Sequence, residues 1–370
     1  MRPRPQISVT EGIALGTCVV WPTSELYLPS VIATAGREDG WLGLLAGALV
    51  VIPVALVVAA LAGRLPHMGL PDQAQVVLGR WLGRIPAGIF VLGTAFLAAY
   101  AVRAGTDMVG LLMLPRTPPW VVAAVIVGQA AVGAYYGLEV VARAAVIAFL
   151  AVAAVLVILI AGFVPLFDAR YLVPVLSRGP GPPLVSAAIA AGFWGQQVLG
   201  AMGAHAFRGA RELRAAVLGA AAASVLAGWL LFTLGQGAAG WYGMSRLTLP
   251  TIELVRSVRM FLPLLERVDV LVVIGWTAMG FAQVAWLLWA CAWGSARVAG
   301  LVDARPLLPL WTAAIFAGAV SLPEDLAVLI QVWTGVFVPV TVAGLIAVVL
   351  LLWLVAALRG VKPEKGRGGR

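Results

Sequence analysis

Charged residues are scarce in this chain: they make up 11% of its 370 residues. A soluble globular domain carries about 25% charged residues, so the composition excludes an ordinary soluble domain. Histidine and cysteine occur only twice each and far apart, as His67, His205, Cys18 and Cys291. This spacing offers no disulfide framework and no metal-ligand cluster, and no nucleophile–base pair or phosphate-binding loop is recognisable. We therefore expect neither an enzyme nor a bound cofactor or metal.

Lysine is rare as well, and arginine supplies most of the basic residues behind the net charge of +9. The arginines do not form one basic patch but lie in short segments between hydrophobic runs. If the N-terminus is cytoplasmic, the cytoplasmic segments hold most of them, which is the positive-inside pattern of membrane proteins. The pattern predicts both termini in the cytoplasm, a basic tail over residues 361–370 near anionic membrane lipid, and no nucleic-acid partner.

Long hydrophobic runs dominate the chain: 62% of the residues are hydrophobic and the mean hydropathy is +1.00. We predict about ten membrane spans, because a run of about 20 apolar residues crosses a bilayer. They form one integral domain over residues 1–360, and the N-terminus shows no cleavable signal pattern. The predicted spans are residues 8–33, 41–62, 86–114, 119–137, 140–166, 184–207, 212–239, 268–296, 307–322 and 326–358.

Two of these spans are interrupted by helix-breaking residues. The first, Ile7–Ala33, contains Trp21–Glu25, and the sixth, Leu184–Phe207, contains Gly192–Gln197. Unwound backbone is tolerated inside a membrane only where it lines a protein-enclosed cavity, and matched breaks in two halves point to a transporter substrate site. We predict an all-α integral membrane protein with a LeuT-like five-plus-five inverted repeat and broken helices 1 and 6. The alternative is a bundle of straight helices with incidental kinks.

The first interruption offers binding groups for an amino acid. Pro22 cannot donate a backbone hydrogen bond, and the N–H groups that open the following half-helix favour a carboxylate. Thr23 and Ser24 add hydroxyl groups, and Glu25 would neutralise an ammonium group or take up a proton. Alternatively, the segment is a proline kink in which Thr23 and Ser24 satisfy the freed carbonyl groups.

The second interruption is predicted to supply the opposite wall. Gly195 permits close approach of the backbone, and Gln196 and Gln197 offer amide groups. Phe193 and Trp194 would wall or gate the pocket. Taken alone, these two aromatic residues would be ordinary packing residues, but the coincidence of both interruptions favours a site.

Three further residues complete the predicted substrate site: Tyr100 and Arg103 in the third span and Trp276 in the eighth. Arg103 lies four residues before Asp107, so the two side chains can pair on one helix face. Ionisable groups at this depth usually serve function, although a self-neutralising pair with a structural role fits the spacing equally well. Trp276 either faces the cavity, together with Gln283, or packs.

Three other segments have structural rather than chemical meaning. Leu70–Arg84 has the pattern of an amphipathic helix on the cytoplasmic surface. Phe167–Pro183 is rich in proline and predicts a non-helical connector on the outer face. The alanine-rich run Ala215–Ala223 either lets a neighbouring helix approach closely or forms a lipid-facing helix.

Several segments, in order along nearly the whole chain, resemble the spore germination permease family, the B subunits of nutrient germinant receptors. The most specific are Leu247–Arg256 and Pro263–Asp269, followed by Trp276. Weaker ones are Leu28-Pro29 with Asp39-Gly40-Trp41, Leu78–Gly83, Tyr136–Glu139 with Ala142-Arg143, and Leu172–Leu176. The chain departs from the family pattern at Pro22-Thr23-Ser24, where Gly-x-Gly is usual, and at Gln196 or Gln197, where a glutamate is common.

The resemblance implies a ten-span member of the amino-acid–polyamine–organocation superfamily in the spore inner membrane. Such a protein would bind a germinant, commonly an amino acid, beside an A-type subunit and a lipoprotein C-type subunit. Two alternatives stay open. One is an autonomous amino-acid permease, proton-coupled through Glu25. The other is a structural subunit that assembles a receptor around a vestigial pocket.

Overall fold

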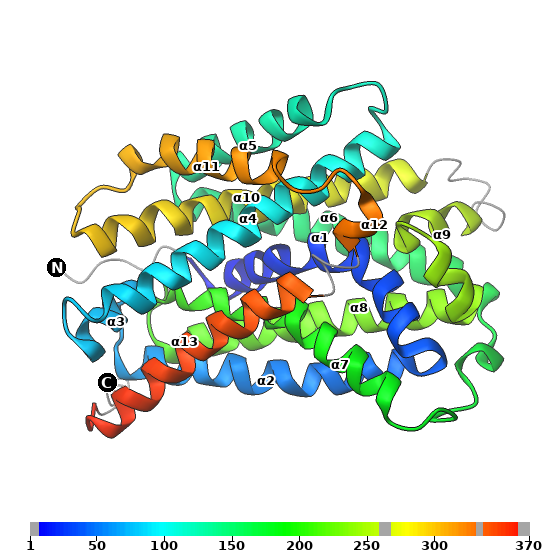
Figure 1. Ribbon diagram of the computed structural model, residues 1–370, viewed down its shortest axis with the longest axis horizontal. Coiled ribbons are helices and arrows are strands. Elements are labelled where there is room, and N and C mark those ends of the chain that lie inside the picture. The colour runs from blue at the N-terminus through cyan, green and yellow to red at the C-terminus, as the bar shows by residue number, and fades with distance from the viewer. Residues whose placement is uncertain (1–6, 259–267, 331–335, 362–370) are drawn as a thin grey trace.

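The computed structural model of the protein describes residues 7–258, 268–330 and 336–361. Most of the segment Pro263–Asp269 and of the predicted basic tail therefore lies outside the described residues. Within the described part the regular elements are helical, and the long helices run roughly along one axis of the molecule (Figure 1). These long helices are α1 (Val9–Gly36), α2 (Gly40–Arg64), α4 (Arg84–Leu112), α5 (Pro119–Tyr136), α6 (Leu138–Phe163), α7 (Gly181–Trp194), α8 (Ala210–Arg246), α10 (Val268–Ala299), α11 (Leu308–Val320) and α13 (Val338–Leu358).

The number of apolar helices confirms the prediction of about ten spans. Eight apolar segments of the described chain are long enough to cross a membrane, and the first of them, Val9–Arg64, comprises both α1 and α2. A shorter apolar segment, Arg305–Val320, includes α11. The last predicted span begins at residue 326, whereas α13 begins at Val338 and is preceded by the short helix α12 (Leu326–Val328).

The predicted surface segments lie at the two ends of the bundle. The amphipathic segment forms α3 (Leu70–Leu78), whose Leu70 is buried, and Asp72 of this helix pairs with Arg297 of α10 at 2.8 Å. The helix α9 (Pro250–Val258) lies at the opposite end (Figure 1). The connector between α6 and α7 contains only short 3-10 turns in the described structure, among them η3 (Ala169–Leu172), in agreement with its proline content.

Helix α1 differs from the expectation. It stays helical from end to end, although Pro22 and Pro29 lie inside it, where an unwound segment was expected at Trp21–Glu25. The hydroxyl groups of Thr23 and Ser24 each donate to the carbonyl oxygen three residues earlier, at 3.2 Å. The N–H group that Pro22 lacks would have donated to the carbonyl oxygen of Cys18, so these bonds to Val20 and Trp21 reinforce the neighbouring turn without replacing the missing one. The continuous helix nevertheless fits the interpretation of a proline within a helix better than that of an unwound segment.

Helix α7 breaks at the predicted place. Its α-helical part ends at Trp194, and the chain continues as a 3-10 helix, η4 (Gly195–Ala201). A further short 3-10 turn, η5 (Ala204–Ala206), leads toward α8. The interruption predicted for the sixth span is therefore confirmed. At the place predicted for the first span, α1 is a continuous helix.

The alanine-rich run of α8 packs closely against α1. A methyl group added to Gly12 would come within 2.7 Å of Ala216 Cβ, and one added to Gly16 within 2.7 Å of Ala220 Cβ. The two backbones can approach this closely only because both faces carry small residues. Of the two interpretations of Ala215–Ala223, close helix packing is confirmed, and it fixes the N-terminal half of α1 against α8.

Candidate functional site around the middle of α1

Buried polar side chains surround the middle of α1. Thr23 and Glu25 are each 2% exposed, and Ser24 is fully buried. Polar groups at this depth are costly unless they find partners. The partners come from elements that are far away in the sequence.

Helix α10 supplies two donors to α1. The indole Nε1 of Trp276 donates to the carbonyl oxygen of Pro22 at 3.0 Å. The amide Nε2 of Gln283 donates to the carbonyl oxygen of Val19 at 2.6 Å and to Thr23 Oγ1 at 3.1 Å. A carbonyl oxygen has two lone pairs, so these bonds add to those of the helix and fix α1 against α10.

Two other elements add a donor each. Gln197 of η4 donates its amide Nε2 to the carbonyl oxygen of Gly16 at 3.3 Å. Thr251 of α9 donates its hydroxyl to the carbonyl oxygen of Glu25 at 2.9 Å. The carbonyl groups of α1 thus accept hydrogen bonds from α10, η4 and α9 at once, which ties the position of α1 to all three elements.

The Glu25 carboxyl group points at α8. A methyl group on Gly228 would stand 2.5 Å from Glu25 Oε1 and 3.4 Å from Trp194 Cζ2, so this glycine makes room for both side chains. Ser224 lies one helical turn before Gly228 on α8. Its hydroxyl and the indole Nε1 of Trp194 are buried without a hydrogen-bond partner among the described residues. Each unsatisfied buried donor costs about 1–3 kcal/mol, so the two donors favour a polar ligand here.

Two small cavities flank α1. One, of about 30 Å³, lies between α1, α4, α5 and α10 and is lined by Pro22, Thr23 and Trp276 among others. The other, of about 40 Å³, lies between α1, η4 and α8 and is lined by Gln196 and Gln197. Spaces of this size hold one or two water molecules. The site is therefore closed in this structure.

Arg103 and Asp107 pair as the spacing predicts. Arg103 Nε lies 2.9 Å from Asp107 Oδ1, and Arg103 Nη1 donates to the carbonyl oxygen of Leu322 at 3.1 Å. The hydroxyl of Tyr27 in α1 donates to Asp107 Oδ2 at 3.1 Å. This network joins α4 to α1 and to the end of α11.

The structure does not bring all predicted site residues together. Pro22, Thr23 and Trp276 line one of the two cavities, and Gln196 and Gln197 line the other. Six further predicted residues are buried but line neither cavity: Ser24, Glu25, Tyr100, Arg103, Phe193 and Trp194. Gly195 faces α13, because a methyl group there would approach Val342 Cγ1 to 3.0 Å. Its small size therefore serves the packing of α13, and Arg103 serves the network with Asp107.

Sequence reasoning missed four residues of this region: Tyr27, Ser224, Gly228 and Thr251. A signal existed for two of them, because Ser224 and Gly228 continue the four-residue spacing of the small residues of α8 that face α1. The apolar context of Tyr27 gave no sign of its partner Asp107, 80 residues away.

A helical bundle with an interrupted α7 and a buried polar centre on α1 defines a multi-pass membrane protein of transporter fold. A solved structure of similar shape supports this class: the substrate-bound outward-open state of a Na⁺-coupled sialic acid symporter. The similarity has a TM-score of 0.61 and covers 90% of this chain and 78% of that one. At 11% sequence identity it establishes the fold alone.

The chain belongs to the spore germination protein family, whose sequence model matches residues 6–326. Two relatives from Bacillus subtilis (strain 168) are similar over most of their length. Spore germination protein YndE is 22% identical over 300 residues, which cover 80% of this chain and 82% of the relative. Spore germination protein A2 is 25% identical over 283 residues, which cover 75% of this chain and 76% of the relative.

Proposed function

We propose that this chain is the transporter-like membrane subunit of a spore germinant receptor and that it binds a small nutrient, an amino acid, near the membrane midplane. The observation that carries the proposal is the arrangement of Glu25, Ser224 and Trp194. A buried carboxylate suits the ammonium group of an amino acid, and two donors without partners suit its carboxylate. The assignment to germination rests on membership of the family.

Binding at this place would be transmitted through α1. A ligand that draws on Glu25 or competes for the α1 carbonyl groups changes the bonds made by Trp276, Gln283, Gln197 and Thr251. A ligand shifts a conformational equilibrium by its differential affinity for the two states. The shifted helix would pass the signal to A-type and lipoprotein C-type partner subunits in the spore inner membrane.

The first test is the germination of spores that carry Glu25→Gln, which keeps the size of the side chain and removes its charge. Loss of a charged contact to an ammonium group is expected to raise the nutrient concentration for half-maximal response about tenfold or more. The matched control is Glu139→Gln, because the Glu139 side chain on α6 is 48% exposed. Gln197→Leu is expected to abolish the response while membrane insertion persists. A normal response in both site variants would refute the site assignment.

A transport assay separates a receptor subunit from an autonomous permease. The purified chain alone, reconstituted in proteoliposomes, is tested for counterflow of labelled amino acids across a mixed panel. The receptor proposal expects no saturable exchange until the partner subunits are added. Saturable exchange by the chain alone, with pH-driven uptake lost in Glu25→Gln, would instead support a proton-coupled permease.

A further inference from the structure

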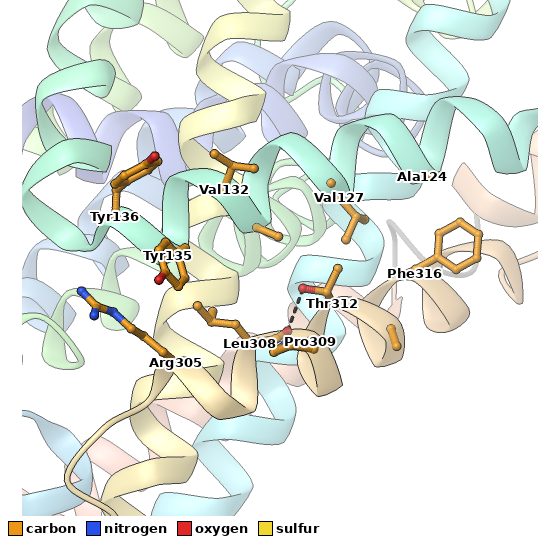
Figure 2. Close-up of a pocket in the computed structure, with 13 residues that line it drawn as sticks. Ala124, Val127, Val132, Tyr135, Tyr136, Arg305, Leu308, Pro309, Thr312 and Phe316 are labelled. Atoms are coloured by element: carbon orange, nitrogen blue, oxygen red, sulfur yellow. Dashed lines mark hydrogen bonds between the residues drawn. The ribbon is translucent and has the colours of Figure 1, made fainter.

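A large open groove lies on the outside of the helix bundle, and no residue of α1 lines it. It lies between α5 and α11, which run side by side, and has a volume of about 780 Å³ (Figure 2). Small residues line much of it: Ala124, Gly128, Ala131 and Ala313. The hydroxyl of Thr312 donates to the carbonyl oxygen of Leu308 at 2.7 Å, so the wall presents little polarity to an occupant. The volume lies within the range of small-ligand sites, about 300–1,000 Å³.

One end of the groove is basic. The guanidinium Cζ of Arg305 lies 5.1 Å from the centre of the Tyr135 ring, and Tyr136 stands beside it (Figure 2). Among the described residues Arg305 forms no ion pair, and the groove has no acidic lining residue. The nearby Asp303 carboxylate accepts from the backbone N–H of Arg305, at 3.1 Å. The charge of the guanidinium group is therefore available to an anion.

The groove also lies at a membrane boundary. Tyr135 and Tyr136 are 52% and 66% exposed, as expected for tyrosines at the level of lipid headgroups. Helix α11 has 13 residues and so spans about 20 Å, less than the bilayer core of about 30 Å. A short helix leaves headgroups close to its ends, which brings a phosphate within reach of Arg305.

We propose that this groove binds an anionic phospholipid, with an acyl chain along the α5–α11 slot and the phosphate on Arg305. An apolar slot that ends in a guanidinium group without an ion pair among the described residues matches one acyl chain and the phosphate of such a lipid. Arginine binds phosphate through two parallel hydrogen bonds. A purely apolar helix of a second copy or of another protein would fill the slot but would bring no anion to Arg305.

Native mass spectrometry of the detergent-purified chain tests the headgroup contact. We expect retained phosphatidylglycerol in preference to phosphatidylcholine, and about a tenfold loss of that preference in Arg305→Gln, because a charge-assisted contact is removed. Arg246→Gln is the matched control: Arg246 also stacks on a tyrosine, Tyr242 at 5.2 Å, but lies outside the groove. Equal lipid preference in Arg305→Gln and wild type would overturn the proposal.

The acyl-chain contact is tested separately. Gly128→Leu fills the groove without a clash, because no atom lies within 4 Å of a methyl group placed there, and it is expected to lower the occupancy of both lipids. Gly88→Leu, equally unobstructed on α4, is the control. In wild-type protein, phosphatidylglycerol with a photoreactive acyl chain is expected to crosslink to peptides of α5 and α11. Crosslinks confined to other helices, or a second protein copy retained in place of lipid, would refute it.

Discussion

Arg103 and Asp107 neutralise each other in the core of the bundle, where their side chains are 8% and 12% exposed. Desolvating two charges costs several kcal/mol each, and the pair recovers this only with good geometry and extra hydrogen bonds. Leu322 and Tyr27 supply those bonds. Between the two interpretations left open by the spacing, these contacts favour a structural role that ties α1, α4 and α11 together.

Removal of one charge is therefore expected to destabilise the protein more than removal of both. Arg103→Leu leaves the Asp107 carboxylate buried without its partner, and it should lower the free energy of unfolding by about 3–5 kcal/mol. The double variant Arg103→Leu/Asp107→Leu should recover most of this loss. Denaturation in detergent micelles measures both changes.

Tyr27→Phe serves as the reference variant in that experiment, because it removes only the hydrogen bond from Tyr27 to Asp107. It should lower the free energy of unfolding by only about 1 kcal/mol. If the double variant is no more stable than Arg103→Leu, the pair does not act as a self-neutralising unit. A germination defect in the stable double variant would instead point to a role in nutrient recognition.

At the level of the helices, α1 shows why a proline in a sequence does not by itself break a span. Pro22 removes one backbone donor, but the hydroxyl groups of Thr23 and Ser24 and donors from α10 provide new bonds to the carbonyl groups around it. Helix α7, which has Gly192 and Gly195 and no proline at the break, ends at Trp194 and gives way to the 3-10 helix η4. A helix-breaking residue therefore does not by itself say whether a span is interrupted.

The close packing of α1 on α8 depends on the absence of side chains at the contact. In Gly16→Leu the new Cβ would lie 2.7 Å from the Cβ of Ala220, so the two helices would have to move apart. This displacement should lower the free energy of unfolding by about 1–3 kcal/mol. The melting temperature in detergent is expected to fall. The control is Gly110→Leu on α4, where no atom lies within 4 Å of an added Cβ, and it should leave the melting temperature unchanged. Equal melting temperatures for both variants would show that this contact is adaptable.

At the scale of the whole molecule, α3 and α9 lie at opposite ends of the bundle (Figure 1). This placement agrees with the orientation expected from the arginine distribution, in which α3 lies at the cytoplasmic end and α9 at the outer end. If both termini are cytoplasmic, the connector before α7 lies outside and the turn between α10 and α11 lies inside. The short α11 and the arginine beside it then face the cytoplasmic leaflet.

Cysteine labelling tests this orientation. Both native cysteines, Cys18 and Cys291, are fully buried, so an introduced cysteine gives the signal. Ser177→Cys in the exposed connector should react with a membrane-impermeant maleimide from outside, whereas Val302→Cys, at a fully exposed position, should react only after permeabilisation. The reverse pattern would invert the orientation.

The amino-acid sequence alone determined the class of this protein. Scarce charge and repeated apolar runs predict a multi-pass helical bundle, because the energy of placing a segment in a bilayer depends on that segment's own composition. The spacing of Arg103 and Asp107 predicts their pairing, since residues four apart share a helix face. The ordered segments from Leu28 to Trp276 indicated the family for a similar reason, because each segment is recognised from its own few neighbouring residues.

Only the tertiary structure decided the composition of the polar centre. Gln283 reaches Val19 across 264 positions of the chain, and Thr251 reaches Glu25 across 226. No local pattern encodes such pairs, because they depend on how the helices pack against one another. The same packing directs Gly195 toward α13, joins Arg103 to the carbonyl oxygen of Leu322, and accompanies an α1 that stays helical through Pro22, where the sequence predicted a break.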